Sequence, residues 1–201
     1  FKIQPNENIR REYLYRIKKN FYKLIHQEKE FINNNTIFKD IKDSDLNVIK
    51  QLSLIDTMSK ISIGFLINQI SKSLDSNGVY VNIGVWRGFS MFAGMLNTEC
   101  EVYGVDNFSF DYKDGNSLLN NENEEVNARR YFTKYFNKFR NKKKHFFFDM
   151  DYKIFFNTWE QRKKGIDFYY YDGEHSYNNQ YDNLVIAKDF LKKDAIILID
   201  D

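Results

Sequence analysis

Five short apolar runs alternate with helical segments after Gly78, and this alternation limits the fold more than any other feature of the chain. The runs lie at residues 79–83, 102–105, 145–148, 166–171 and 195–199. Apolar residues recur at helical spacing between them, at residues 89–96, 124–139, 153–162 and 181–191. Continuous apolar strands that alternate with helices are typical of a parallel sheet covered on both faces. The pattern therefore predicts an α/β fold with a doubly wound parallel sheet.

The chain before Gly78 shows helical spacing alone, at residues 9–32, from Asp43-Ser44-Asp45 onward, and at residues 60–74. Asp43-Ser44-Asp45 is expected to cap the second of these helices. We expect an N-terminal helical extension at residues 1–57 and the α/β domain at residues 58–201. The chain stops directly after its fifth apolar run, so we expect an excerpt of a longer protein, truncated after the fifth strand. Residues 107–123 form a long polar loop, a candidate lid.

Charge and cysteine content exclude several classes of protein. The 30 Lys and Arg residues nearly balance the 28 Asp and Glu residues, which gives a formal charge of +2. This balance does not indicate a nucleic-acid partner. The single cysteine, Cys100, cannot form an intrachain disulfide and favours a reducing compartment. No apolar run approaches the ~20 residues of a membrane span. We expect a soluble, cytoplasmic protein without a membrane partner.

A glycine turn follows the first predicted strand, in the segment Asn82-Ile-Gly-Val-Trp-Arg-Gly88, and a helix begins near Ser90. Glycines allow close approach of a ligand to the backbone, and a helix N-terminus offers free N–H groups. The spacing is not the Gly-x-Gly-x-x-Gly of dinucleotide sites, so an NAD(P)-dependent oxidoreductase is disfavoured. The glycines can equally serve only to make the turn tight.

An acidic residue, Asp106, ends the second predicted strand. An acid at this position is placed to accept hydrogen bonds from both hydroxyls of a ribose. The alternative is a surface carboxylate that caps the following loop. Its occurrence together with the glycine turn favours the ribose role.

Three carboxylates follow the last two predicted strands. Asp172 precedes Gly173, Glu174 and His175, and Asp200-Asp201 follow the final run. If these strands are parallel neighbours, their ends lie ~5 Å apart. A cluster of carboxylates suits Mg²⁺ or a similar hard cation.

Two ambiguities accompany this metal prediction. Consecutive strand residues face opposite sides, so Asp200 and Asp201 can share a metal only if the backbone turns there. The carboxylates can also be ordinary solvated groups at strand ends. His175 is a candidate base or metal ligand, or else a polar turn residue.

Taken together, these segments resemble the class I S-adenosylmethionine (SAM)-dependent methyltransferases, especially the branch of the macrocin-type sugar O-methyltransferases. Three stretches carry the resemblance: residues 82–88, Val105-Asp-Asn-Phe108, and Asp172-Gly-Glu-His-Ser-Tyr177 with Ile199-Asp-Asp201. The resemblance covers about residues 58–201 and implies a Rossmann-like fold. This family usually has an acidic residue where this chain has Asn82.

The resemblance also implies roles for individual residues. It assigns cofactor binding to Asn82, Gly84, Trp86, Arg87, Gly88, Ser90, Asp106, Asn107, Asp149, Met150 and Asp172. It makes Asp172, Asp200 and Asp201 the Mg²⁺ ligands, with Asp172 or His175 as the catalytic base. Asp149 or Met150 is then expected near the adenine.

The activity implied is transfer of the SAM methyl group to an oxygen of a small-molecule acceptor, such as a sugar or another natural product. The N-terminal helices and the loop at residues 107–123 are then expected to cover the site or to form a contact in a homo-oligomer. Two other functions stay open. One is a metal-dependent phosphoesterase, which leaves the glycine turn and Asp106 without a role. The other is a catalytically degenerate binding module, for which Asn82 is the main indication.

Overall fold

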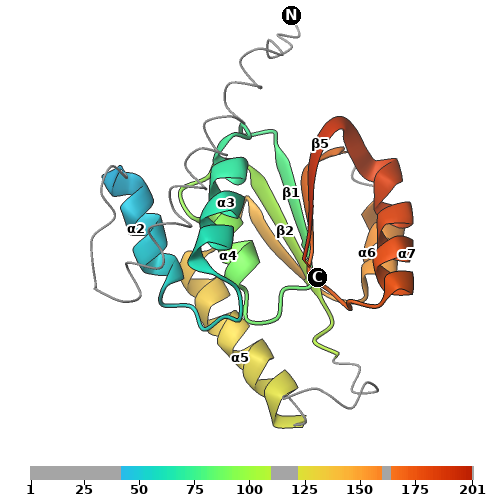
Figure 1. Ribbon diagram of the computed structural model, residues 1–201, viewed down its shortest axis with the longest axis horizontal. Helices are drawn as coiled ribbons and strands as arrows, with labels where there is room; N and C mark the ends of the chain where they lie inside the picture. Colours follow the sequence, from blue (N-terminus) through green and yellow to red (C-terminus); the bar gives the residue numbers. More distant parts are fainter. Residues whose placement is uncertain (1–41, 110–121, 160–163, 201) are drawn as a thin grey trace, which may run out of the picture.

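The computed structural model describes residues 42–109, 122–159 and 164–200. Its strands are β1 (Val79–Ile83), β2 (Glu101–Asp106), β3 (His145–Asp149), β4 (Ile166–Tyr171) and β5 (Leu191–Ile199). They form one sheet in the order β3-β2-β1-β4-β5, with every neighbouring pair parallel (Figure 1). The predicted doubly wound, Rossmann-like parallel sheet is confirmed.

The helices lie between the strands as the hydrophobic spacing predicts. They are α2 (Asp43–Leu52), α3 (Ile61–Lys72), α4 (Phe89–Met95), α5 (Glu122–Phe139), α6 (Tyr152–Trp159), α7 (Tyr177–Ala187) and the 3₁₀ helix η3 (Lys188–Phe190). The predicted helix at residues 9–32, most of the loop at residues 107–123, and Asp201 lie outside the described residues. No helix of the described segments combines the length and the hydropathy of a membrane span.

The cap of α2 and the starts of α7 and β5 differ from the prediction for local reasons. Helix α2 is capped by Lys42 without a side-chain hydrogen bond, so the expected Asp43-Ser44-Asp45 cap is wrong. Asp43 and Asp45 instead lie in the first turn, where negative charge favours the helix dipole. Helix α7 begins early because Ser176 caps it by accepting a hydrogen bond from the Asn179 N–H. Strand β5 begins at Leu191, ahead of the predicted start, since its charged first half lies exposed at the sheet edge.

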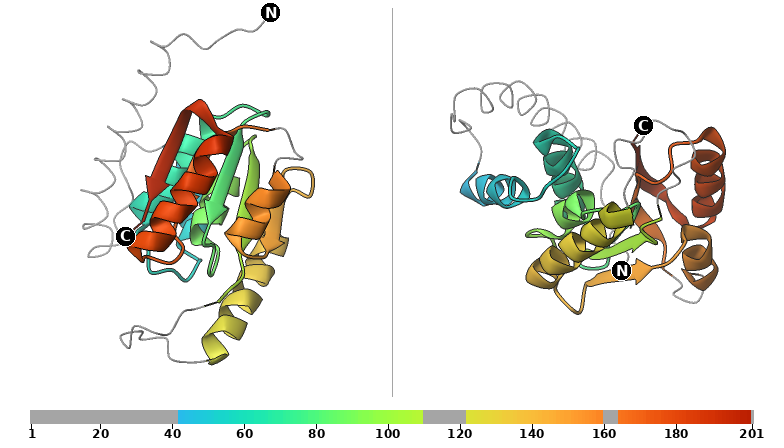
Figure 2. Two further views of the ribbon diagram at one scale, coloured as in Figure 1. Left: turned by 90° about the vertical axis from the view of Figure 1, so that its right-hand side faces the viewer. Right: turned by 90° about the horizontal axis from the view of Figure 1, so that it is seen from below.

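Alternate strand residues face two different hydrophobic cores. Tyr80 and Phe168 stack on one face and pack with residues of α2, α3, α4 and α5. Val81 and Tyr169 face the other side, where α6 and α7 cover the sheet. Figures 1 and 2 show the sheet between these two helical layers. Because both faces of the central strands are covered, β1 and β4 consist mainly of buried hydrophobic and aromatic residues.

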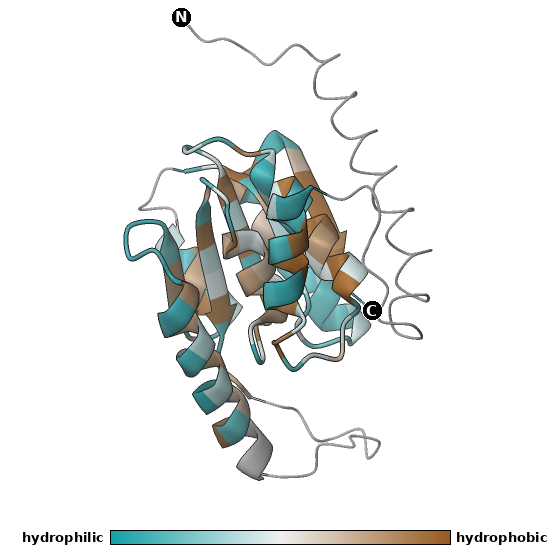
Figure 3. Ribbon diagram, turned by 90° about the vertical axis from the view of Figure 1, so that its left-hand side faces the viewer, coloured by the Kyte–Doolittle hydropathy of each residue, from teal (hydrophilic) through white to brown (hydrophobic). Residues whose placement is uncertain are grey.

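The first helical layer carries the longest helix of the described chain, α5. Hydrophilic and hydrophobic residues alternate along it (Figure 3). Its buried Phe132 ring stacks on Phe92 of α4, with ring centroids 5.5 Å apart. The amphipathic pattern therefore docks α5 on α4 and leaves its polar side to solvent.

The strand order places a switch point between β1 and β4, because the chain leaves β1 toward β2 on one side and β4 pairs on the other. In doubly wound sheets, ligands bind outside the carboxyl ends of the strands at such a point. The glycine turn after β1 and the acidic turn after β4 meet here. This juxtaposition is the basis of the candidate site.

Candidate active site

A cavity of about 890 Å³ opens at the carboxyl ends of the strands around the switch point. Its walls come from the turns and segments that follow β1, β2, β3, β4 and β5, and from the connection between α2 and α3. The sequence-predicted residues that line it are Gly84, Trp86, Ser90, Asp106, Asn107, Met150, Asp172, His175 and Asp200. One cavity therefore brings together the three segments that the sequence singled out.

The glycine turn packs directly on the acidic turn. Gly84 has φ +80°, and a Cβ added there would lie 2.0 Å from the carbonyl oxygen of Asp172. Any side chain at this position would collide with backbone, so glycine is required. Gly88 has φ +97° and precedes α4, where a Cβ would meet the Phe92 ring at 2.3 Å. Both glycines thus have a structural function, and Gly84 also lines the cavity.

Asp106 holds the walls on both sides of its strand end through backbone hydrogen bonds. Its Oδ2 accepts from the N–H groups of Val85 and Trp86, both at 2.7 Å, and its Oδ1 accepts from Phe108 N–H at 2.6 Å. Trp86 and Phe108 have φ of +44° and +53°, which a non-glycine residue rarely adopts. The carboxylate therefore stabilises two strained turns.

These contacts limit what Asp106 can offer a ligand. A carboxylate has about four lone-pair sites, and three are taken by backbone N–H groups. One remains for a ribose hydroxyl, whereas the sequence prediction had the carboxylate serve two. The prediction that Asp106 binds a ribose stays a prediction, with this geometric restriction.

The acidic pair Asp172 and Asp200 lines the cavity beside the glycine turn. Both carboxylates meet the hydroxyl of Tyr170, whose oxygen is 3.5 Å from Asp172 Oδ2 and 3.2 Å from Asp200 Oδ2. Burial, with a further contribution from the Asp200 charge, raises the pKa of Asp172 to about 7. A carboxyl group with this pKa exchanges a proton readily at neutral pH.

His175 lies three residues beyond Asp172. Its Nε2 is 3.7 Å from Asp172 Oδ1, and its side chain is 52% exposed. It lines the cavity, with its imidazole next to Asp172. The structure thus places His175 where a base can act, and its role stays a prediction.

The residues that would hold Mg²⁺ are only partly described. No group of three His, Cys, Asp or Glu side chains within the described segments is arranged around a metal, and Asp201 lies outside them. Asp172 and Asp200 do form a carboxylate pair on the cavity wall. Mg²⁺ commonly binds one or two carboxylates and keeps several waters. The pair therefore fits Mg²⁺ with water completing its coordination.

Four predicted cofactor contacts do not line the cavity: Asn82, Arg87, Gly88 and Asp149. Asn82 is fully buried behind the turn, where its Oδ1 accepts from Ser90 Oγ and its Nδ2 donates to the Gly84 carbonyl. The side chains of Arg87 and Asp149 form ion pairs with Asp56 and Arg129, respectively. Asn82 therefore supports the shape of the glycine turn from below.

Sequence reasoning missed several residues of the cavity. Tyr170 belongs to a run of three tyrosines that predicts a buried strand. Side chains alternate between the two faces of a strand, and in the structure only the Tyr170 hydroxyl meets the acidic pair. Tyr152 lies at the start of α6, and Thr57–Ser59 reach the cavity from the connection between α2 and α3. Met58 is 77% exposed at this rim. Nothing in the sequence near residues 57–59 indicates a binding site.

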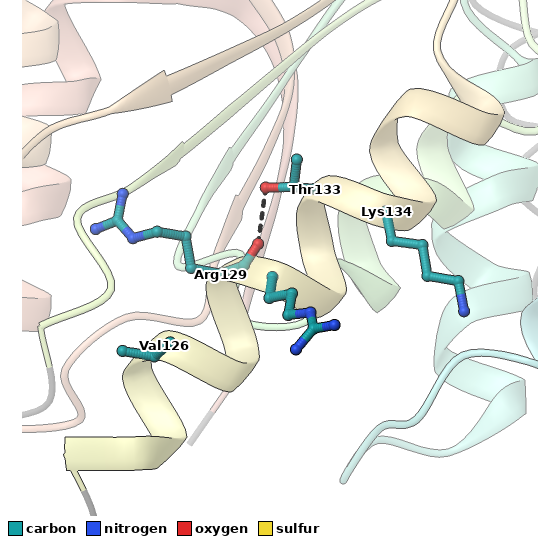
Figure 4. Close-up of a pocket in the computed structure, with 5 residues that line it drawn as sticks. Val126, Arg129, Thr133 and Lys134 are labelled. Atoms are coloured by element: carbon teal, nitrogen blue, oxygen red, sulfur yellow. Dashed lines mark hydrogen bonds between the residues drawn. The ribbon is translucent and has the colours of Figure 1, made fainter.

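A second hollow, of about 540 Å³, lies on the outer side of α5 (Figure 4). It is lined by Val126, Arg129, Arg130, Thr133 and Lys134, all from the one helix. The Thr133 hydroxyl donates to the Arg129 carbonyl within the helix. This shallow surface has no catalytic grouping among its lining residues, so the cavity at the switch point is the candidate active site.

Comparisons with solved structures agree with the Rossmann-like fold. The structure is similar to that of an O-methyltransferase from Bacillus cereus in complex with S-adenosylhomocysteine (SAH). The TM-score is 0.55 and the identity 12%, over 87% of this chain and 71% of that one. It is also similar to a Staphylococcus aureus protein assigned as a caffeoyl-CoA O-methyltransferase. Here the TM-score is 0.51 and the identity 13%, over 90% and 72% of the two chains.

A search of curated protein sequences finds no match. A family model described as a methyltransferase domain, Methyltransf_24, matches residues 81–201. The matched region contains the glycine turn, Asp106, the acidic pair and all five strands except the first two residues of β1. Because the match covers more than half of the sequence, the chain belongs to the Methyltransf_24 family of methyltransferase domains.

Proposed function

We propose that the protein is a SAM-dependent O-methyltransferase that methylates a hydroxyl group of a small molecule with the help of a divalent cation, Mg²⁺. One observation carries the proposal. A single cavity is lined by two groups of residues, the glycine turn with Asp106 and the Asp172–Asp200 pair. The first group suits a nucleoside cofactor, and the second suits a cation that activates a hydroxyl.

The chemistry of the cavity wall fits SAM. The indole Nε1 of Trp86 and the hydroxyl of Tyr152 belong to cavity-lining residues, are buried, and have no hydrogen-bond partner among the described residues. Buried donors of this kind are normally satisfied, so they point to a polar ligand. Five carboxylates also line the cavity, those of Asp106, Asp151, Asp172, Glu174 and Asp200. Their negative field favours a cationic ligand such as the SAM sulfonium.

When bound, SAM supplies a methyl group on a positively charged sulfur, and Mg²⁺ lowers the pKa of a hydroxyl that it binds. The chain's own residues orient the acceptor and take its proton. Asp172 and His175 are the candidate bases, since both line the cavity. The hydroxyl proton moves to one of them as the oxygen accepts the methyl group. Alignment in the cavity provides much of the remaining acceleration.

The position of Asp106 favours this function over a phosphoesterase. Asp106 stabilises the strained turns at Trp86 and Phe108, which line the same cavity. A phosphoesterase that used only the acidic pair would have no use for this wall. A binding module without catalysis would bind the cofactor in the same way. Only measurements of Mg²⁺ stimulation and of methyl transfer distinguish it from a methyltransferase.

Calorimetry on the full chain tests the proposal directly. We expect SAH to bind, and we expect Asp106→Ala to weaken binding at least about 10-fold because it releases the turn that forms the cofactor wall. Asp189→Ala is the control, since Asp189 is an exposed carboxylate of η3 that does not line the cavity. No binding of SAH or SAM at millimolar concentration would exclude the methyltransferase function.

Methyl transfer itself is tested with radiolabelled SAM and a panel of small hydroxyl compounds. We expect Mg²⁺ to stimulate transfer and Asp172→Ala to abolish the stimulation while SAH binding persists. Transfer that survives this substitution in the presence of a chelator would exclude the metal-assisted mechanism. SAH binding without transfer to any acceptor would favour the binding module.

A further inference from the structure

We infer that Tyr170 is a positioning residue, whose hydroxyl holds the carboxylates of Asp172 and Asp200 in the arrangement that binds a divalent cation. The inference rests on the proposed function, because it takes the cation site as given. It adds a residue of β4 that contributes no ligand of its own. The sequence alone presents Tyr170 as one of three equivalent buried tyrosines.

The geometry singles out Tyr170 among its neighbours. Its hydroxyl oxygen lies 3.2 Å from Asp200 Oδ2 and 3.5 Å from Asp172 Oδ2. The hydroxyl of Tyr169 points to the other face of the sheet and donates to the side chain of Asn183. The Tyr171 hydroxyl donates to the Glu174 carbonyl at 2.8 Å. Only one hydroxyl of the three reaches the acidic pair.

Tyr170 is held in place by its surroundings. Its side chain is part of the first hydrophobic core, and the residue is 3% exposed. It pairs with Asn82 of β1 on one side and with Leu198 of β5 on the other. Both neighbours of the hydroxyl are also anchored: the Asp172 N–H donates to the Ile83 carbonyl at 2.8 Å, and the Asp200 N–H donates to the Tyr171 carbonyl at 2.9 Å. Packing therefore holds the Tyr170 ring, and hydrogen bonds hold the backbones of Asp172 and Asp200 on either side of its hydroxyl.

One phenol proton serves two carboxylates, and this shared donor offsets part of their mutual repulsion. The contacts involve only the Oδ2 atoms, so lone pairs of both carboxylates stay available to a cation. Removing a group that hydrogen-bonds to metal-binding side chains and orients them typically weakens metal affinity 10- to 100-fold. Without the hydroxyl, the two carboxyl groups lose their common partner and are free to rotate apart when no cation is bound. A cation must then bring them together again at the expense of its binding free energy.

The test is Tyr170→Phe, which keeps the ring and removes the hydroxyl. Tyr169→Phe is the matched control, because it removes a buried hydroxyl from the adjacent residue on the opposite sheet face. Mg²⁺ affinity is measured by calorimetry on the full chain, and Mn²⁺ is used as a spectroscopic probe of the site by electron paramagnetic resonance. SAH affinity and urea unfolding are measured on the same three proteins.

We expect Tyr170→Phe to weaken Mg²⁺ binding about 10- to 100-fold and to alter the Mn²⁺ spectrum. SAH affinity is expected to change less than about 2-fold, and Tyr169→Phe is expected to keep the wild-type Mg²⁺ affinity. Equal Mg²⁺ affinity in Tyr170→Phe and wild type would overturn the inference and leave the proposed function intact. A parallel loss in both tyrosine variants would also overturn it, since the effect would then be structural. If the wild type itself binds no divalent cation, the metal part of the proposed function fails, and the inference fails with it.

Discussion

Replacing Asp172 by asparagine should change how the stability of the protein depends on pH. Burial and the nearby Asp200 charge raise the pKa of Asp172 from its ordinary 3.8 to about 7. Between these values the native state binds the proton that the unfolded chain has lost. The free energy of unfolding of the wild type therefore falls as pH rises through this range, and it levels off above pH 7. An asparagine side chain does not titrate, so the variant lacks this fall.

The size of the effect follows from the two pKa values. Their difference corresponds to at most about 4 kcal/mol over the whole range. The Asp172 side chain is 33% exposed. Solvent screening at such a position reduces the effect, and we expect about 1–2 kcal/mol between pH 5 and pH 8.

Urea unfolding of both proteins at pH 5 and pH 8, with a chelator present, measures this difference. The stability of Asp172→Asn minus that of the wild type should rise by about 1–2 kcal/mol from pH 5 to pH 8. Other titrating groups are common to both proteins and cancel in the comparison. Asp149→Asn is the control, because Asp149 is exposed and paired with Arg129. A difference that stays constant with pH would refute the argument that burial and Asp200 hold a proton on Asp172.

Three further substitutions test the packing around the site, each by urea unfolding at pH 7. Gly84→Ala should lower the free energy of unfolding by at least about 2 kcal/mol, because a φ of +80° is strained for alanine and its Cβ would collide with the Asp172 carbonyl. An unchanged urea midpoint would contradict this prediction. Asp106→Ala should lower the free energy of unfolding by about 2–4 kcal/mol, because three backbone N–H groups lose their acceptor. Asp106→Asn should lower it less. Equal losses would show that the charge of Asp106, and not its acceptor atoms, stabilises the turns. Asn68→Ala should cost about 2–3 kcal/mol, since the buried Asn68 amide donates to two carbonyls at the end of α4; a loss below about 0.5 kcal/mol would show that water replaces it.

Local patterns in the sequence were enough to predict the central sheet and the helices that cover it. The predicted bounds of β1 and β4 agree with the structure because these strands are covered on both faces and consist mainly of hydrophobic and aromatic residues. The start of β5 was missed because an edge strand tolerates the exposed charges at Lys192 and Lys193. The cap of α2 was missed because three adjacent polar residues offer several equivalent caps.

The meeting of Asp172 and Asp200 was also predictable, since both follow parallel strands and the carboxyl ends of such strands share one edge of the sheet. The roles of single atoms were not. Asn82 was predicted to contact the cofactor, yet its amide supports the glycine turn from behind. Asp106 was predicted to meet a ribose, yet most of its lone-pair sites accept backbone N–H groups.

The sequence by itself determined which segments become strands and helices and which end of the sheet carries the polar turns, because hydrophobic period and glycine placement act over neighbouring residues. Only the tertiary structure decided that the Tyr170 hydroxyl stands between two carboxylates and that residues 57–59 border the cavity. These contacts join residues that are distant in the chain. Their distances depend on strand register and on how helices pack across the sheet, which no local pattern encodes.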